Sequence, residues 1–208
     1  VCSSDLGIVP WNAPILVLMR KVIPAIVTGC SVVIKPSEET TLLTLRLAEL
    51  FRASTIPAGL IQIVPGTGET VGTQLASHKD IQLISLTGSM RAGKSVYENA
   101  AQTVKKVNLE LGGNAPVIVT SNADLDKAVD YIVTARINNA GQVCTCPERI
   151  LVHEDVHDDF LNKVTSKMKS LTVGDPFDEN TDYGAIINQK QLDSIHEKVQ
   201  DAIKKDRK

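Results

Sequence analysis

The chain has 208 residues, of which 43% are hydrophobic, a composition typical of a packed globular protein. It carries 22 basic and 24 acidic residues and a formal charge of -2, so it has no broad cationic field for nucleic acid or an anionic membrane surface. The longest apolar runs, 13–19 and 61–64, fall well short of the roughly 20 residues that span a bilayer, so we expect no membrane partner.

Both ends of the chain predict a fragment. Residues 1–6 begin without Met and read as a non-native leader translated from a sequencing adapter, so we set them apart from the fold. The last residues follow a helical pattern with no capping glycine and no closing strand. We therefore expect truncation at both ends.

Residues 7–113 predict an α/β fold. In chain order, we expect helix 14–27, strand 31–34, helix 41–53, strand 60–64, helix 69–77, strand 82–87, helix 91–101 and strand 107–111. Most of these strands are apolar nearly throughout, which is typical of strands buried on both faces. Alternation of this kind predicts a Rossmann-type open parallel sheet that binds a nucleotide.

A second α/β unit is expected over residues 114–208, because the pattern changes after Gly112 and Gly113. Its predicted elements are strand 116–119, helix 125–139, strand 149–153, helix 156–170 and helix 189–204. The stretch 174–184 is irregular, and neither unit contains an internal repeat.

Cys144 is a candidate nucleophile because it lies in the loop between a predicted helix and a predicted strand, where a side chain can face a cleft. On this spacing alone, a buried structural cysteine is the more common outcome. Cys144 and Cys146 also form a C-x-C pair, but no second pair or neighbouring histidine completes a zinc site, so we expect no metal. Cys146 is expected to be a packed neighbour rather than a redox partner.

Glu110 is a candidate general base at the end of an apolar strand. Burial would raise the pKa of its carboxyl group, as a base working near neutral pH requires. The alternative, of equal weight from sequence alone, is a carboxylate that pairs with a lysine or caps the next turn. Gly112 and Gly113 favour the functional interpretation, since they allow close approach of backbone or ligand.

Three segments are candidates for nucleotide binding. Gly88 and Ser89 lead from a strand into a helix, whose free N–H groups can face a pyrophosphate. Lys35 and Glu38 follow a strand and can hold a ribose, although Ser37 with Glu38 is equally a helix cap. The Gly66–Gly72 segment lacks the last spacing of the dinucleotide fingerprint, and we interpret it as a structural turn.

Five motifs in order resemble those of the aldehyde dehydrogenase superfamily. They are Pro10-Trp11-Asn12, Lys35-Pro36-Ser37-Glu38, Thr87-Gly88-Ser89, Leu109-Glu110-Leu111-Gly112-Gly113 and Gly141-Gln142-Val143-Cys144. The resemblance extends from Gly7 to the end of the chain. It implies an aldehyde-dehydrogenase-like fold, with part of an NAD(P)-binding domain in 7–113 and part of the catalytic domain in 114–208.

The resemblance also implies the chemistry. Cys144 would attack the aldehyde, Asn12 and the Cys144 amide would stabilise the oxyanion, and Glu110 would activate water to hydrolyse the thioester. Lys35 and Glu38 would hold the adenosine ribose of NAD, with NADP as the alternative coenzyme. The other residues implied at the coenzyme are Pro10, Trp11, Ser37, Gly88, Ser89, Gly93 and Leu111.

The substrate implied is a small aldehyde, and the motifs are most similar to those of lactaldehyde or glycolaldehyde dehydrogenases. Alternative functions are a CoA-acylating member of the superfamily, which Glu110 disfavours, and a catalytically silent structural homologue. The resemblance further implies a homodimer or homotetramer. Cysteine spacing without a disulfide pattern or signal peptide favours the cytoplasm.

Overall fold

The computed structural model describes residues 4–205 and divides into two compact units, Val1–Gly112 (unit 1) and Gly113–Lys208 (unit 2). This division falls one residue before the boundary expected from the sequence. Within residues 4–205, no helix is both long enough and apolar enough to cross a membrane.

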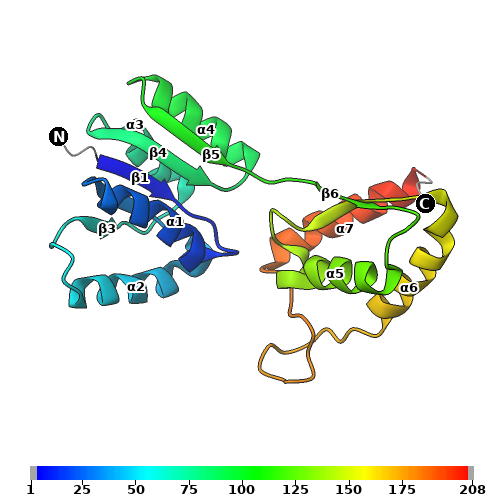
Figure 1. Ribbon diagram of the computed structural model, residues 1–208. Coiled ribbons are helices and arrows are strands. Elements are labelled where there is room, and N and C mark those ends of the chain that lie inside the picture. Colours follow the sequence, from blue (N-terminus) through cyan, green and yellow to red (C-terminus); the bar gives the residue numbers. More distant parts are fainter. Residues whose placement is uncertain (1–3, 206–208) are drawn as a thin grey trace. The chain divides into compact units, whose positions relative to one another are not determined.

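Unit 1 is built on a five-stranded parallel sheet in the order β3-β2-β1-β4-β5 (Figure 1). Its strands are β1 Ser4–Ile8, β2 Ser31–Lys35, β3 Ile61–Ile63, β4 Ile81–Thr87 and β5 Lys106–Glu110. Its α-helices are α1 Pro14–Val27, α2 Thr41–Ala53, α3 Thr73–Ser77 and α4 Met90–Ala101, with a 3₁₀ turn at Glu38–Thr40 and a π-helical turn at Gly68–Gly72. The chain runs outward from β1 to β2 and β3, then crosses back to β4 and β5, so the strand order reverses between β1 and β4.

Two apolar clusters, one on each face, bury the sheet of unit 1. Leu18 and Val22 of α1 pack with Val32 and Ile34 of β2. Ala76 of α3 and Val96 and Ala100 of α4 pack with Leu6, Ile81, Ile84 and Leu86. This arrangement confirms the predicted α/β fold with helices on both faces of a parallel sheet.

The strand β1 is the largest departure from the expected elements. Ser4, Asp5 and Leu6 were set apart as part of a leader, yet they form β1 between β2 and β4, and Leu6 is 0% exposed. Residues 1–3 of the expected leader lie outside the described residues. A short strand with polar residues at Ser4 and Asp5 lacks the apolar run that marked the other strands. The non-native origin of 1–6 stays a prediction.

Helix boundaries agree closely with the sequence pattern where the capping residues are clear. Helices 14–27, 41–53 and 189–204 have the expected bounds. Pro14 occupies the first turn of α1, and the Asn188 side chain accepts a hydrogen bond from the Gln191 amide at the start of the last helix. The single helix expected over 69–77 was wrong, because a π-helical turn through Gly72 precedes α3.

Unit 2 contains a two-stranded parallel sheet, β6 Ala115–Val119 and β7 Pro147–Val152. Its helices are α5 Leu125–Ile137, α6 His157–Lys169 and α7 Gln189–Lys204, with 3₁₀ turns at Asn138–Gly141 and Glu154–Val156. Val119, Val129, Ile132, Val133 and Phe160 form its buried core. On the surface, Lys163 pairs with Asp126 and Lys167 with Asp130, which joins α6 to α5.

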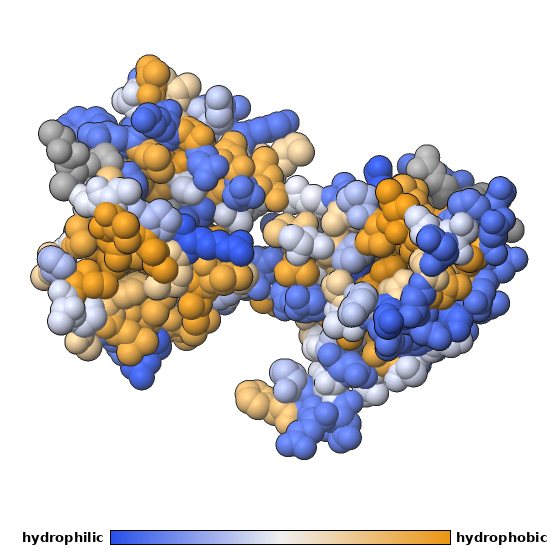
Figure 2. Space-filling model, viewed as in Figure 1, coloured by the Kyte–Doolittle hydropathy of each residue, from blue (hydrophilic) through white to orange (hydrophobic). Residues whose placement is uncertain are grey.

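Apolar side chains are also exposed on α1 and α2 of unit 1. Val27 is 78% exposed and Leu42 is 80% exposed, and Leu16, Leu43 and Leu50 add to the same two helices. Figure 2 shows hydrophobic surface gathered over this part of the chain.

The Lys21 side chain of unit 1 lies over β1 beside Gly7 and reaches β4. The Lys21 Nζ of α1 donates to Ser85 Oγ at 2.9 Å and to Thr87 Oγ1 at 3.0 Å, both on β4. A Cβ atom on Gly7 would lie 3.2 Å from Lys21 Cδ, so glycine leaves room for this side chain over β1. Burial lowers the pKa of Lys21 to about 8, and the nearby Glu110 carboxylate opposes that shift.

We expect Lys21 to make stability depend on alkaline pH. Between about pH 8 and pH 10.5 the unfolded chain keeps the proton that the folded Lys21 has lost, so the free energy of unfolding rises with pH. The Lys21→Met variant loses this rise together with a pH-independent contribution from two hydrogen bonds. Urea unfolding of both proteins from pH 7 to 11 measures the slope, and a constant difference across that range would contradict the shifted pKa.

Leu6→Ala is expected to destabilise unit 1 by about 3 kcal/mol, because truncating a fully buried leucine leaves a cavity. Leu151→Ala is the matched control, since Leu151 on β7 is 58% exposed and its truncation costs about 0.5 kcal/mol or less. Urea unfolding followed by circular dichroism compares the two. Equal stabilities of the two variants would show that β1 does not form the centre of the sheet.

Candidate functional site

A cleft of about 720 Å³ opens at the carboxyl edge of the sheet in unit 1. Ile8 at the end of β1, Lys35 at the end of β2 and Leu86 near the end of β4 line it. Its other walls come from the segment 67–76 and from α4. Open α/β sheets bind ligands at this edge where the strand order reverses, which here is between β1 and β4.

Lys35 and Glu38 meet inside this cleft. Lys35 Nζ lies 3.1 Å from Glu38 Oε1, and the Lys35 side chain is only 4% exposed. The same carboxylate oxygen accepts a hydrogen bond of 2.7 Å from the Gly68 amide. The loop after β2 is therefore joined to the loop after β3.

Glu38 is held as a carboxylate. Partial burial alone would raise its pKa, but hydrogen bonds from backbone amides and from Lys35 outweigh that effect and lower the pKa below its usual value. Glu38 is therefore ionised at neutral pH and presents an acceptor to a hydroxyl-bearing ligand.

The remaining residues expected at a coenzyme have structural contacts and do not line the cleft. Ser37 and Ser89 are N-caps, accepting from the amides of Glu39 and Ala92. The Gly88 amide donates to the Glu110 carbonyl at 3.0 Å, which joins the end of β4 to β5.

Close packing and chain turns account for the other four expected residues. Gly93 packs so closely on Leu111 that a Cβ would lie 2.9 Å from Leu111 Cδ2. Pro10 and Trp11 are partly exposed in the turn between β1 and α1.

Several cleft residues were not predicted as binding residues. Segment 66–72 was interpreted as a structural turn, yet Thr67, Gly68 and Glu69 line the cleft. From α4, the cleft is lined by Arg91, Ser95 and Asn99. The glycine pattern at 66–72 was the available signal for the first group. The sequence carried no signal for the α4 residues, because their position at the cleft depends on which face of the helix is turned toward it.

Asn12 and Glu110 lie in unit 1: Asn12 is in the bend between β1 and α1, and Glu110 is the last residue of β5. The expectation that Glu110 is buried was wrong, because its side chain is exposed. Within unit 1, β5 pairs only with β4, and as an edge strand it alternates between exposed and half-buried residues. β3, the other edge strand of this sheet, also alternates between exposed and half-buried residues. Burial on both faces is therefore limited to the central strands.

Cys144 lies in unit 2, exposed in the turn that leads to β7. The turn begins with Asn139, Ala140 and Gly141, all of which have left-handed backbone. Cys146 is 1% exposed and accepts a hydrogen bond of 3.0 Å from Arg136 Nη1, so the expected packed neighbour is observed. Among residues 4–205, no three His, Cys, Asp or Glu side chains gather as metal ligands.

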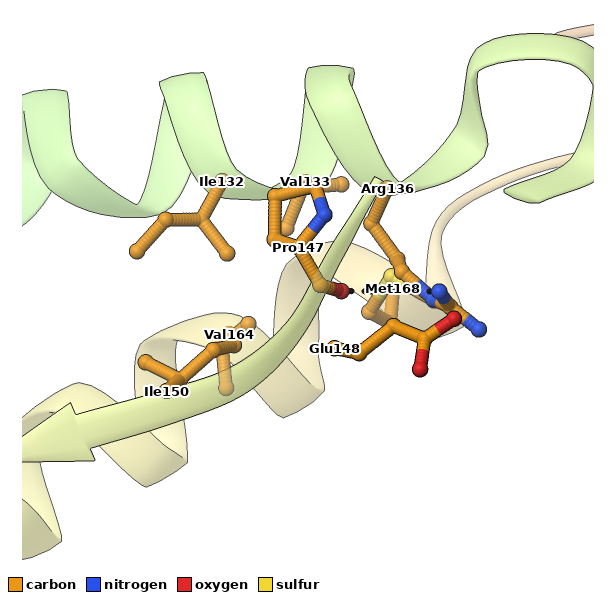
Figure 3. Close-up of a pocket in the computed structure, with 8 residues that line it drawn as sticks. All are labelled: Ile132, Val133, Arg136, Pro147, Glu148, Ile150, Val164 and Met168. Carbon is orange, nitrogen blue, oxygen red and sulfur yellow. Dashed lines mark hydrogen bonds between the residues drawn. The ribbon is translucent and has the colours of Figure 1, made fainter. Parts of the chain in front are cut away.

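A second cavity of about 440 Å³ lies in unit 2 between α5, β7 and α6. Its lining is mostly apolar, with Arg136 and Glu148 at one end (Figure 3). None of the residues expected to act in catalysis or coenzyme binding lines it, so it is separate from the predicted chemistry.

Comparison with known proteins gives relatives along nearly the whole chain. Lactaldehyde dehydrogenase of Escherichia coli is 41% identical over 95% of this chain, and the succinate-semialdehyde dehydrogenase of that organism named for NADP(+) is 40% identical over 96%. The chain spans 41% of the length of each of these relatives. The crystal structure of betaine aldehyde dehydrogenase from Staphylococcus aureus in complex with NAD+ superimposes with a TM-score of 0.95. It is 37% identical, and the match covers 98% of this chain and 40% of that one.

The match to a family model settles the relationship. Residues 5–208 match the model of the aldehyde dehydrogenase family, which includes Asp5 and Leu6 of β1 and both units. The ordered motifs, the parallel sheet with its cleft and the exposed cysteine turn agree with this match. The chain belongs to the aldehyde dehydrogenase family.

Proposed function

We propose that the full-length protein oxidises a small aldehyde to the carboxylic acid through a covalent intermediate on Cys144. The observation that carries the proposal is the exposed Cys144 thiol in the turn before β7, within a chain of the aldehyde dehydrogenase family. A thiolate is a strong nucleophile toward a carbonyl carbon.

In the proposed reaction, Cys144 Sγ bonds to the aldehyde carbon and forms a thiohemiacetal oxyanion. The Asn12 side-chain amide and the Cys144 backbone amide donate hydrogen bonds to that oxyanion, each lowering the barrier by about 3 kcal/mol. When bound, NAD would accept the hydride that leaves the same carbon, and Cys144 would then carry a thioester. Glu110 takes a proton from water, which attacks the thioester and releases the acid and the thiol.

The cleft of unit 1 is the proposed coenzyme site. Lys35 and Glu38 would bind the adenosine ribose, and a pre-ionised carboxylate suits a ribose diol. Gly88, Ser89 and Gly93 would adjoin the pyrophosphate at the start of α4. The other proposed contacts are Pro10, Trp11, Ser37 and Leu111.

We infer a preference for NAD over NADP. The relatives include a structure in complex with NAD+ and an enzyme named for NADP(+), so the choice depends on residues of this chain. Glu38 supports NAD, because its negative charge repels a 2′-phosphate.

Glu38→Gln is expected to raise kcat/KM for NADP relative to NAD by about tenfold, since it removes a charge repulsion of about 1 kcal/mol or more. Glu49→Gln is the control, because Glu49 is an exposed carboxylate on α2 paired with Arg46. Initial rates with both coenzymes measure the ratio. An unchanged ratio in Glu38→Gln would remove Glu38 from coenzyme selection.

Cys144→Ser is expected to abolish NADH formation, because an un-ionised hydroxyl is a far weaker nucleophile than a thiolate. Glu110→Gln is expected to release one equivalent of NADH rapidly and then stall, because the thioester forms without a base to hydrolyse it. Stopped-flow absorbance with a panel of small aldehydes and mass spectrometry of the stalled protein provide the measurements.

Three other outcomes would each redirect the proposal. Steady turnover by Glu110→Gln would remove Glu110 as the base. Turnover that requires coenzyme A would indicate the acylating reaction. A wild-type protein inert with every aldehyde would indicate the silent homologue.

The proposal extends to organisation and location. Unit 1 would serve as part of the NAD(P)-binding domain and unit 2 as part of the catalytic domain. The exposed apolar side chains of α1 and α2 support contacts with further protein, consistent with a homodimer or homotetramer. A cytoplasmic location fits Cys144 and Cys146, neither of which forms a disulfide within the described part of the chain.

A further inference from the structure

The turn that carries Cys144 has a strained backbone. Asn139, Ala140 and Gly141 have φ angles of 50°, 55° and 78°. Glycine enters this left-handed region without steric conflict and asparagine enters it readily, so Ala140 is the residue held there against its preference. Such backbone persists only where neighbouring contacts fix it. The contacts around the turn therefore show what holds Cys144 in place.

The first of these contacts is made by Arg136, in the last turn of α5. Its Nη1 donates to Cys146 Sγ at 3.0 Å and to the Pro147 carbonyl at 3.4 Å, the second of which is drawn in Figure 3. The Cys146 thiol in turn lies 3.5 Å from the Arg136 carbonyl as a donor. The side chain and the backbone of Arg136 therefore both engage the buried cysteine.

Arg136 also contacts the other end of the turn. A Cβ atom on Gly141 would lie 3.2 Å from the Arg136 carbonyl and 3.4 Å from its Cζ. The guanidinium group thus lies against Gly141, three residues before Cys144, and bonds to Cys146, two residues after it. One side chain holds both ends of the strained turn.

Gln142 provides a separate anchor. Its Oε1 accepts from the Ile187 amide at 3.0 Å, and its Nε2 donates to the Asn139 carbonyl at 2.9 Å. These bonds tie the turn to the segment before α7. Gln142 therefore anchors the part of the turn before Cys144, and the Arg136–Cys146 hydrogen bond anchors the part after it.

We propose that Arg136 and Cys146 form a positioning clamp that sets the turn so that Cys144 is presented to substrate. Cys146 acts in it as a buried hydrogen-bonding group, and Arg136 supplies a planar guanidinium that reaches a thiol and a carbonyl together. A lysine ammonium lacks that fork and reproduces the arrangement only in part. The clamp rests on the proposed role of Cys144 as the nucleophile, although its geometry is independent of aldehyde chemistry.

The test measures thiol labelling and kinetics on the full-length protein. Iodoacetamide labelling of each cysteine, read by mass spectrometry, is expected to modify Cys144 and spare Cys146 in the wild type. In Arg136→Met, labelling of Cys146 rises about tenfold and kcat falls about tenfold, while KM for NAD stays within twofold. Arg136→Lys recovers part of both effects, which a purely space-filling role would not produce.

Lys127→Met is the control, because Lys127 is an exposed cation on α5 whose ion-pair partner is Asp124. It should match the wild type in labelling and in kcat. An Arg136→Met protein that keeps Cys146 protected and kcat unchanged overturns the clamp. The proposed function fails separately if wild-type Cys144 proves inert toward aldehydes, because the labelling of Cys146 in the wild type and in Arg136→Met is measured without any aldehyde.

A second pair of variants decides the question if Arg136→Met does not fold. Cys146→Ser keeps a donor and an acceptor, whereas Cys146→Val fills the space without either. The clamp predicts that the serine variant keeps more than half of kcat and that the valine variant loses about tenfold. Equal kcat values in the two variants overturn it.

Discussion

The strand β1 pairs in parallel with β2 on one side and with β4 on the other, and this pairing decides where unit 1 can bind a ligand. Parallel strands end at the same edge of the sheet, and the reversal of strand order at β1 and β4 leaves a crevice there. Lys35 ends β2 at that edge, and Glu38 is close enough to accept from the Gly68 amide. Lys35 and Glu38, the proposed coenzyme contacts that line the cleft, therefore depend on this one arrangement of strands.

Local sequence was sufficient for most elements of the fold. The α1 helix was predicted with its observed bounds because Pro14 starts it and its apolar spacing is uninterrupted. β1 was missed because Ser4, Asp5 and Gly7 dilute the apolar signal of a five-residue strand. Its burial comes from neighbours far along the chain, which periodicity within a short window does not report. The π-helical turn at Gly68–Gly72 was missed because helical spacing continues through it.

Site residues could be predicted from the sequence where a charged side chain comes directly at or after the end of a predicted strand. Lys35 and Glu38 follow a strand, and the cleft contains both. The exposure of Glu110 was not predictable, since an edge strand is defined by the topology of the sheet rather than by its own residues. Arg136 carried no sequence signal at all, because its role depends on a turn that folds back over the end of α5. The chemistry of a residue can therefore be recognised from the sequence, whereas its burial and its contacts with distant segments cannot.

The most direct test is a crystal structure of the full-length protein with bound NAD. The account predicts the adenosine ribose in the cleft of unit 1, with a hydroxyl about 2.7 Å from the Glu38 carboxylate, and the Cys144 thiol open toward the nicotinamide. Adenosine bound outside the cleft, or a Cys144 side chain enclosed by its own turn, would contradict the account.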